Sequence, residues 1–273
     1  MLVARTRLKQ LGLHARKSLS QSFLDDQHVA DEIVRAAELD PSHDEVLEVG
    51  PGLGVLTERL IHTARRVIAV EIDPKLADWL RTEFGDTNLT VHTGDVLEFE
   101  PARWFDRSFV VLANLPYHIT SPALRHLLRV GPPFAQRIIA MVQAEVAERL
   151  SAQPGALSAL AVITQVQAHV RCVRHVPASA FYPRPKVDSA VIRLEPIVDN
   201  ERLIPRDALA EFTSVVQAGF KQPRKQLANS LSEGMAIEKA DAVNLLTTAG
   251  IDPVRRPQEL AIADWVRLFE TTR

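Results

Sequence analysis

Residues 46–54 have the sequence Val-Leu-Glu-Val-Gly-Pro-Gly-Leu-Gly, in which an apolar run passes directly into three alternate glycines. The apolar run predicts a buried β-strand, and the glycines predict a tight turn from that strand into a helix. Because glycine lacks a Cβ, the backbone of such a turn can approach a ligand closely. A strand, a glycine-rich turn and a helix in this order predict a nucleotide-binding α/β fold, and a turn without a ligand is the alternative.

The spacing of the glycines separates two classes of ligand. A dinucleotide-binding turn has the pattern Gly-x-Gly-x-x-Gly and holds a pyrophosphate at the helix N-terminus. Here the third glycine is Gly54, and Val55 stands where that pattern has its last glycine. The observed Gly-x-Gly-x-Gly pattern suits S-adenosylmethionine (SAM), which has no phosphate.

Strand-like and helical patterns alternate on both sides of this turn. Apolar runs typical of strands cover residues 45–50, 67–72, 89–93, 109–115 and 137–142, and helical patterns cover 25–39 and begin near residues 53, 74, 121 and 144. This alternation predicts a parallel sheet with helices on both faces, a Rossmann-like fold of the α/β class. With a SAM-binding glycine turn on such a sheet, the fold class that we expect is that of a SAM-dependent methyltransferase.

The pattern changes toward the C-terminus. We expect a helix at 156–166, strands at 168–176 and 189–194, and a loop at the proline-rich residues 181–185. After a linker at residues 195–200 the patterns are wholly helical. Two domains are therefore expected: residues 1–197, a catalytic domain with a basic N-terminal arm, and residues 198–273, a small all-helical domain.

Composition limits the class of protein. The 273 residues have a net charge of −2 and a single cysteine, Cys172. One cysteine excludes an internal disulfide and cysteine-based metal clusters, and no metal is expected. No apolar run approaches the ~20 residues of a membrane span, and no signal-peptide core follows the N-terminus. We expect a cytoplasmic protein without a membrane partner, and a monomer.

Basic residues gather in three parts of the chain although the overall charge is slightly negative. No acidic residue precedes Asp25, five basic residues accompany one acid between residues 171 and 193, and residues 221–225 hold three more basic residues. The candidate RNA-binding residues are Arg16, Lys17, Arg184, Lys186, Lys221, Arg224 and Lys225. For any single cluster, a solvated charged surface is the alternative.

Acidic residues stand at the ends of the next two predicted strands. Glu71 lies 21 residues after Gly50, where a carboxylate can accept hydrogen bonds from both ribose hydroxyls of SAM or of NAD. Asp95 lies where a short acid can accept from the adenine amino group of the cofactor. Because the carboxyl ends of parallel strands meet at one crevice, these residues and the glycine turn predict a single SAM site.

Residues 114–117, Asn-Leu-Pro-Tyr, close the fourth predicted strand and indicate the chemistry. An adenine amine is a poor nucleophile because its lone pair is delocalised into the ring. The side-chain oxygen of Asn114 and a main-chain carbonyl of Leu115 or Pro116 can accept hydrogen bonds from both amine protons and localise that lone pair. The sulfonium is an activated methyl donor, so no general base is required.

Two aromatic residues are candidates for stacking on the target base. Tyr117 offers a ring face next to the predicted amine site, and such stacking contributes roughly 1–3 kcal/mol. Phe181, in the proline-rich segment, is the candidate for the opposite face of the base, with a role as an ordinary core aromatic as the alternative.

The whole set of motifs resembles the KsgA/RsmA-type ribosomal RNA adenine dimethyltransferases. The resemblance runs nearly end to end, over residues 21–24, 50–54, 70–73, 94–95, 114–117, 141–147, 181–189, 219–220 and 224–231. It implies SAM-dependent dimethylation of two adjacent adenosines near the 3′ end of 16S ribosomal RNA, with S-adenosylhomocysteine as the product. It also implies immature small ribosomal subunits as the partner and a role in their maturation. The helical domain, residues 198–273, would by the same resemblance help to engage the RNA.

The resemblance also places the cofactor contacts by position. They are Gln21, Ser22, Leu24, Gly50, Gly52, Glu71, Asp95 and Asn114. Three positions depart from the family's usual pattern, because Ser22 stands for an asparagine, His118 for an asparagine or tyrosine, and Pro223 for a basic residue.

Two other functions remain open from the sequence. An Erm-like 23S ribosomal RNA methyltransferase or a DNA adenine methyltransferase would use the same residues 114–117. A ribosome-assembly factor without catalysis would keep the fold, but the complete set of cofactor and catalytic motifs argues against it. Residues 224–231 and 257–260 favour the small-subunit enzyme.

Overall fold

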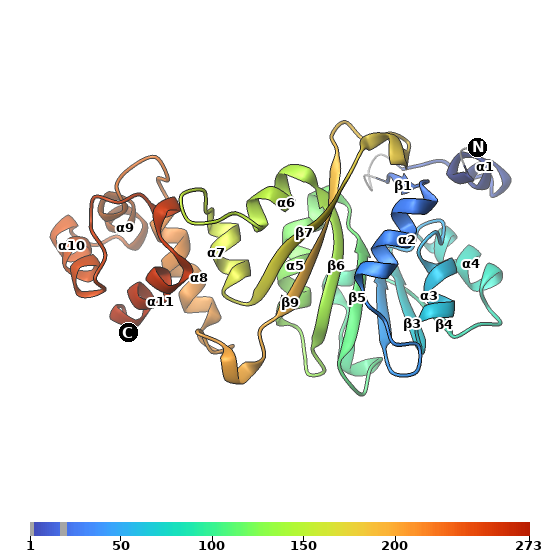
Figure 1. The fold of residues 1–273 in the computed structure, drawn as a ribbon, viewed down its shortest axis with the longest axis horizontal. Helices are drawn as coiled ribbons and strands as arrows, with labels where there is room; N and C mark the ends of the chain where they lie inside the picture. The colour runs from blue at the N-terminus through green and yellow to red at the C-terminus, as the bar shows by residue number, and fades with distance from the viewer. Residues whose placement is uncertain (1–2, 17–20) are drawn as a thin grey trace. The chain divides into compact units, whose positions relative to one another are not determined.

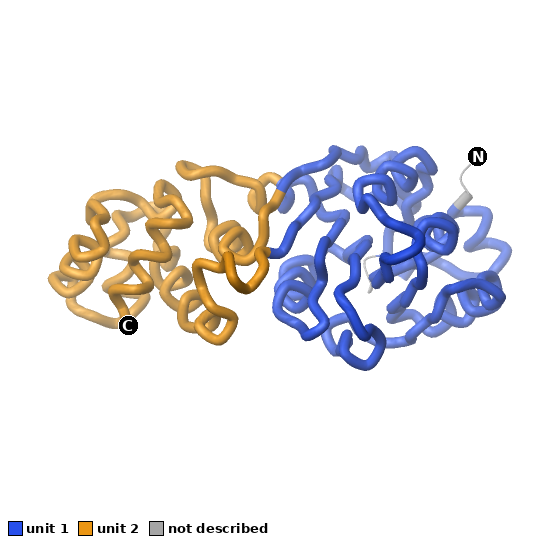
Figure 2. The backbone as a smooth tube through the Cα atoms, turned by 60° about the horizontal axis from the view of Figure 1, so that its bottom comes forward, with its two compact units in different colours: residues 1–147, 171–196 blue, residues 148–170, 197–273 orange. Residues whose placement is uncertain are grey.

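The computed structural model describes residues 3–16 and 21–273, so the predicted RNA-binding residue Lys17 lies outside the described residues. The chain forms two compact units (Figure 2). Residues 1–147 with 171–196 form the first, which we call the sheet unit, and residues 148–170 with 197–273 form the second, the helical unit. The chain passes from the sheet unit to the helical unit between Pro196 and Ile197, one residue before the expected boundary. Residues 148–170, which we expected in the first domain, belong to the helical unit.

Seven strands form the central sheet in the order β4-β3-β2-β5-β6-β9-β7 (Figure 1). They are β2 (Glu45–Val49), β3 (Arg66–Glu71), β4 (Leu89–Thr93), β5 (Phe109–Asn114), β6 (Ala135–Gln143), β7 (Ala168–Val176) and β9 (Ser189–Pro196). The first five strands in this order pair in parallel, and β9 pairs with β6 antiparallel. The predicted parallel sheet is confirmed. Beyond β6 the sheet continues with β9, which is antiparallel to β6, and then with β7.

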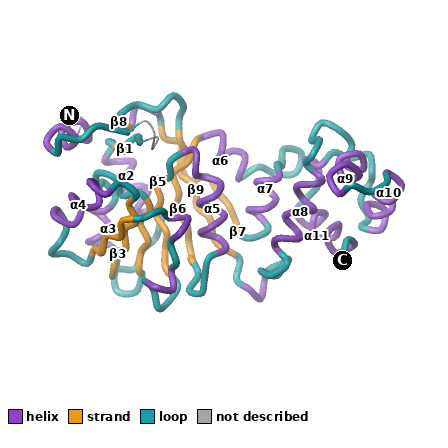
Figure 3. The backbone as a smooth tube through the Cα atoms, turned by 180° about the vertical axis from the view of Figure 1, so that it is seen from behind, coloured by secondary structure: helices purple, strands orange, loops and turns teal. Residues whose placement is uncertain are grey.

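Helices cover both faces of the sheet, as the sequence predicts. α2 (Gln27–Ala36) and α3 (Thr57–Thr63) pack on one face, where Ile33 and Leu60 join a buried cluster with Val46 and Leu112 of the strands. α5 (Thr120–Arg129) covers the other face, as Figures 1 and 3 show from opposite sides. α4 (Pro74–Glu83) follows β3, and α6 (Ala144–Leu150) follows β6.

The strand order reverses between β2 and β5. From β2 the chain proceeds through β3 to β4, and from β5 it proceeds in the opposite direction to β6. At such a reversal, the loops that leave the two adjacent strands diverge and open a crevice at their carboxyl ends. Those loops begin at Gly50 and at Leu115, so the fold places the glycine turn and the Asn114 turn at the same crevice.

Two segments of the sheet unit differ from the sequence-based expectation. The proline-rich residues 181–185 are predicted as a loop, but Phe181–Tyr182 forms a short strand, β8, antiparallel to β1 (Phe23–Leu24). The prediction was wrong for these two residues because Pro183 only ends the strand, while the backbone groups before it remain able to pair. The N-terminal arm contains an unpredicted helix, α1 (Val3–Gln10).

The helical unit has an apolar core of its own. Its helices include α7 (Ala159–Gln165), α8 (Leu209–Gly219), α9 (Leu227–Met235), α10 (Lys239–Thr248) and α11 (Ile262–Thr271). Leu157 and Val162, from the 148–170 segment, pack in one buried cluster with Phe212 of α8 and Trp265 of α11. This shared core is why residues 148–170 belong to the helical unit.

Short 3₁₀ helices connect the main elements. They are η2 (Val96–Glu98), η3 (Pro101–Arg103), η4 (Tyr117–Ile119), η5 (Ala178–Ala180), η6 (Asp199–Glu201) and η7 (Pro257–Glu259). Of these, η4 follows the Asn114 turn directly and leads into α5. Within the described residues, no helix has both the length and the apolar character that crossing a membrane requires.

Candidate active site

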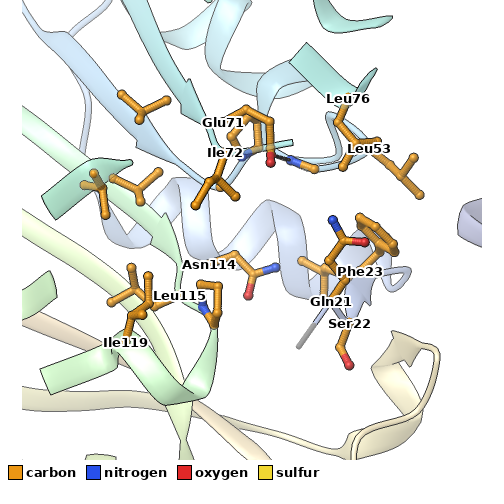
Figure 4. A pocket seen from close by; sticks show the side chains of 18 of the residues that line it. Gln21, Ser22, Phe23, Leu53, Glu71, Ile72, Leu76, Asn114, Leu115 and Ile119 are labelled. Atoms are coloured by element: carbon orange, nitrogen blue, oxygen red, sulfur yellow. Dashed lines mark hydrogen bonds between the residues drawn. The ribbon is translucent and has the colours of Figure 1, made fainter. Parts of the chain in front are cut away.

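A cavity lies at the crevice between the β2 and β5 turns (Figure 4). Its wall contains residues from the carboxyl ends of β2, β3 and β5 and from the short strands β1 and β8. Every residue predicted to bind the cofactor or to act in catalysis lines it: Gln21, Ser22, Leu24, Gly50, Gly52, Glu71, Asp95, Asn114, Leu115, Pro116, Tyr117 and Phe181. The fold thus brings together residues from distant parts of the sequence.

The glycine turn forms one part of the wall. Gly50, Gly52 and Gly54 have φ angles of 67°, 57° and 74°, in the left-handed region that glycine enters at little cost. A Cβ on Gly50 would lie 3.1 Å from the carbonyl oxygen of Asn114, and one on Gly52 would lie 3.0 Å from Cδ1 of Phe23. Glycine is therefore needed here both for backbone conformation and for close packing.

Glu71 ends β3 as a buried carboxyl group with 4% of its surface exposed. One of its oxygens accepts a hydrogen bond from the Gly52 amide at 3.0 Å, and the other accepts from the Asp73 amide at 2.9 Å. Burial raises the pKa of Glu71 above its ordinary value, and the amide hydrogen bonds oppose that rise. Each oxygen keeps a further lone pair, so Glu71 can accept hydrogen bonds from a ligand with paired hydroxyls.

Two further polar side chains of the cavity are held by local hydrogen bonds. Asp95 accepts from the Leu97 amide through one of its oxygens, at 2.9 Å. Gln21 donates to Asp73 at 3.4 Å and accepts from the Arg16 amide at 2.8 Å. The side chain of Arg16, a predicted RNA-binding residue, lies 3.4 Å from the Asp73 carboxylate. Arg16 therefore also supports the wall of the cavity around Gln21.

The Asn114 turn forms another part of the wall. Figure 4 shows the Asn114 side chain pointing into the cavity. The Pro116 carbonyl accepts from the Ile119 amide at 3.0 Å and the Thr120 hydroxyl at 3.4 Å, and these bonds use both of its lone pairs. The turns and loops of the described residues contain no donor to the Leu115 carbonyl. Of the two carbonyls that the sequence leaves open, that of Leu115 is the one available to a ligand.

Two aromatic rings line the cavity. Tyr117 is half-buried, and its hydroxyl lies 2.8 Å from that of Ser189, which is completely buried. Burial raises the pKa of the Tyr117 phenol, which therefore stays neutral at physiological pH. Phe181 is 4% exposed, pairs through its backbone with Leu24 and also belongs to the core cluster of α2. Its role as a second stacking face stays a prediction.

The sequence analysis missed most of the apolar residues of the cavity. Phe23, Leu53, Ile72 and Leu76 all line it (Figure 4). Ile72 is 50% exposed although it is a large apolar residue, and its position directly after Glu71 at a strand end was an available signal. Leu53 and Leu76 have no comparable signal, because a leucine at the start of a helical pattern is normally an ordinary core residue.

Glu48 is a second buried carboxyl group that the sequence analysis did not single out. It lies on β2, two residues before Gly50, and is 1% exposed. One oxygen accepts from the Thr57 hydroxyl at 2.8 Å, and the other has no hydrogen-bond partner among the residues described. Burial raises the pKa of Glu48 to about 8, so the group is mostly protonated at neutral pH.

The predicted RNA-binding residues other than Arg16 and Lys17 lie in two loops. Arg184 and Lys186 are exposed between β8 and β9 of the sheet unit. Lys221, Arg224 and Lys225 are exposed between α8 and α9 of the helical unit. Their binding to RNA stays a prediction.

Sequence comparison identifies similar proteins over nearly the full chain. A family model described as "Ribosomal RNA adenine dimethylase" matches residues 12–273. The chain is 38% identical to the ribosomal RNA small subunit methyltransferase A of Dehalococcoides mccartyi, over 98% of this chain and 92% of that protein. It is 43% identical to the protein of the same name from a Synechococcus species, over 94% of this chain and 96% of that protein.

Two solved structures are similar over most of the chain. The 23S rRNA methyltransferase ErmE is 32% identical with a TM-score of 0.72, and the match covers 91% of this chain and 98% of that one. A dimethyladenosine transferase from Plasmodium falciparum is 26% identical with a TM-score of 0.75, over 90% of this chain and 95% of that one. These similarities confirm the Rossmann-like methyltransferase fold.

Proposed function

The chain belongs to the ribosomal RNA adenine dimethylase family, and we propose that it dimethylates the 6-amino groups of two adjacent adenosines near the 3′ end of 16S ribosomal RNA. The proposed methyl donor is SAM, and the proposed substrate is the immature small subunit in the cytoplasm, bound by a monomer. The observation that carries the proposal is the single cavity lined by the glycine turn, Glu71 and Asn114.

The polar groups of the cavity fit SAM. Glu71 can accept two hydrogen bonds beyond those from the Gly52 and Asp73 amides, and a ribose offers two neighbouring hydroxyl donors. Asp95 uses only one oxygen for the Leu97 amide, so it can accept from an adenine amino group. When bound, SAM supplies a methyl group on an activated sulfonium centre.

Asn114 and Leu115 are suited to hold the target amine. The Asn114 side chain points into the cavity, and the Leu115 carbonyl is not used by another loop residue of the described chain. Each oxygen accepts one amine proton, which draws the nitrogen toward sp³ geometry and localises its lone pair. Positioning of two reacting groups can lower an activation barrier by roughly 7–11 kcal/mol. Positioning by this turn is therefore the main catalytic contribution that we assign to the chain.

Tyr117 is suited to stack on the target base. Its hydroxyl is held by Ser189, so the ring is fixed in orientation without using a face. A fixed ring loses little rotational freedom when a base stacks on it. Phe181 is the proposed partner for the other face of the base.

Similarity to ErmE supports a second candidate, methylation of 23S ribosomal RNA. The curated small-subunit methyltransferases are 38% to 44% identical to this chain, compared with 32% for ErmE. The 16S substrate is therefore the first choice. Incubation with labelled SAM and either immature small subunits or 23S RNA separates the two candidates. Dimethyladenosine near the 3′ end of 16S RNA is the expected product, and modification of 23S RNA alone would refute our proposal.

The Asn114→Ala variant tests the catalytic role of this turn. Loss of the amide oxygen leaves one amine proton without an acceptor, so methyl transfer is expected to fall at least ~100-fold. A thermal melt serves as the control for folding. Because Asn114 is also among the predicted cofactor contacts, affinity for S-adenosylhomocysteine, measured by titration calorimetry, is expected to fall, but far less than methyl transfer. Normal turnover in this variant would remove Asn114 from the mechanism.

A further inference from the structure

The N-terminal helix α1 packs against the apolar side of the cavity. Ala4 and Leu8, which are 1% and 4% exposed, form one buried cluster with Phe23, Leu53 and Leu76. The latter three residues all line the cavity. α1 lies beside α4 in the views of Figures 1 and 3. Side chains of α1 therefore support the cavity wall from behind without lining the cavity.

Arg7 connects α1 to three elements around the glycine turn. Its guanidinium donates one hydrogen bond to the Leu53 carbonyl at 2.9 Å and another to Glu58 of α3 at 2.8 Å. The same group lies 5.7 Å from the centre of the Trp79 ring of α4, within the range of a cation–π contact. Leu53 stands between Gly52 and Gly54, so Arg7 holds the backbone of the turn itself.

A second contact fixes the start of α1. The Ala4 amide donates to the Asp25 carboxylate at 2.6 Å. Asp25 directly follows β1, and its own amide donates to the Ala180 carbonyl at 2.8 Å, next to β8. α1 is thus attached at one point to the β1–β8 side of the cavity and, through Arg7, to the glycine turn.

We propose that α1 supports the SAM site from outside the cavity and that Arg7 is a positioning residue that holds the glycine turn in its binding conformation. The inference rests on the proposed function, because it assumes that SAM occupies this cavity.

The physical reason is the flexibility of the turn. Glycines lose more backbone freedom than other residues when they become ordered, and three of them stand within five positions, from Gly50 to Gly54. A ligand that has to order this segment binds more weakly, because part of its binding free energy offsets the loss of backbone entropy. Because Arg7 already holds the Leu53 carbonyl, the turn is ordered before the ligand arrives.

The experiment compares three variants of the full chain by titration with S-adenosylhomocysteine. Arg7→Ala removes the contact to Leu53, and the loss of such a charged hydrogen bond is expected to weaken affinity roughly tenfold. Arg7→Lys keeps the charge and the stem, but one ammonium cannot reproduce both guanidinium contacts, so affinity is expected to fall several-fold. Arg5→Ala removes an equal charge from an exposed position of the same helix and is expected to bind like the wild type.

Kinetics separates positioning from a purely structural effect. In Arg7→Ala the KM for SAM is expected to rise about as much as the affinity falls, while kcat at saturating SAM stays within about twofold. Unchanged affinity in both Arg7 variants, or an equal loss in Arg5→Ala, would overturn the inference. If Arg7→Ala does not fold, Arg7→Lys decides alone. Wild-type protein that fails to bind S-adenosylhomocysteine would instead contradict the proposed function.

Discussion

The protonation state of Glu48, a buried residue of β2 two positions before Gly50, affects the stability of the fold. Its carboxyl group is buried in the sheet, and one of its oxygens has no partner within the described residues. An ionised carboxylate in such a place would carry an uncompensated charge, which is why its pKa rises to about 8. The Thr57 hydroxyl stabilises the charged form only in part.

This raised pKa makes the stability of the fold depend on pH. In the unfolded chain Glu48 titrates near 4.5, and in the folded chain near 8. Between these values the folded state keeps a proton that the unfolded state has lost, so stability falls as pH rises, by at most ~1.4 kcal/mol per pH unit. Glu48→Gln keeps the neutral shape, so its unfolding free energy is expected to fall less than that of the wild type between pH 5 and 8. Urea titrations at several pH values measure this slope, and equal slopes in the two proteins would contradict the assignment.

The sequence predicts which polar residues line the cavity, because each has a positional signal. Glu71, Asp95 and Asn114 all stand at or just after the carboxyl ends of predicted strands, and such ends converge in a parallel sheet. The choice between the Leu115 and Pro116 carbonyls could not be predicted. It depends on hydrogen bonds from Ile119 and Thr120, which exist only after η4 and α5 have formed.

At the scale of elements, the backbone conformation of the glycine turn shapes the wall of the proposed SAM site. Its amide at Gly52 holds Glu71, and the missing Cβ at the same residue leaves room for Phe23. A side chain at this position would therefore disturb the cavity wall even if the hydrogen bond to Glu71 survived.

Gly52→Ala tests this element. The φ angle of 57° costs an alanine about 1–2 kcal/mol, and the added Cβ would lie 3.0 Å from Phe23. Affinity for S-adenosylhomocysteine is expected to fall at least ~10-fold, because displacement of Phe23 or of the turn alters the site. Calorimetric titration and a thermal melt measure affinity and stability separately.

Gly250→Ala is the matched control for this variant. Its φ angle is 69°, and a Cβ there would have no heavy atom within 4 Å. The backbone cost is therefore similar, while no contact with the cavity changes. A loss of affinity in both variants would show that general destabilisation, and not the cavity wall, explains the effect at Gly52.

Other elements differ in how far the sequence predicts them. β4 (Leu89–Thr93) and β7 (Ala168–Val176) have the predicted bounds, because runs of β-forming residues are a local signal. The pairing of β1 with β8 joins two segments of two residues each, too short for any local pattern. α1 was missed because its sequence, rich in basic residues, has only a weak apolar face and no acidic residue in its first turn.

At the scale of the whole molecule, packing decides which residues belong together. The sequence places residues 148–170 with the catalytic domain, because strand-like patterns return at residues 168–176 and 189–194 and the patterns become wholly helical only after the linker at residues 195–200. In the structure, α7 and its neighbours bury Leu157, Val162 and Val166 in the core of the helical unit. Residues 148–170 belong to the helical unit because they pack against apolar residues such as Phe212, about 50 residues later in the chain. A local sequence pattern does not reveal contacts between segments so far apart.

Charge is also unevenly distributed over the molecule. The net charge is only −2, so attraction to RNA has to come from local basic clusters rather than from the whole surface. Lys221, Arg224 and Lys225 form such a cluster in the loop between α8 and α9. They are exposed, and no salt bridge to another described residue neutralises them, so their charges remain available to phosphates.

Simultaneous replacement of Lys221, Arg224 and Lys225 by glutamine tests whether this loop binds RNA. Each lost phosphate contact is expected to reduce the slope of log affinity against log salt by roughly 0.7–0.9, and three contacts by roughly 2–3. When salt rises from 50 to 200 mM, the wild type is then expected to lose affinity by a factor roughly 20 to 40 times larger than the variant does. Filter binding of immature small-subunit RNA over this range measures the slope.

Lys239→Gln, which removes an exposed charge on α10 of the same unit, is the control and is expected to keep the slope of the wild type. An unchanged slope in the triple variant would instead make the cluster an ordinary solvated surface and leave the attraction to RNA to the basic residues of the sheet unit.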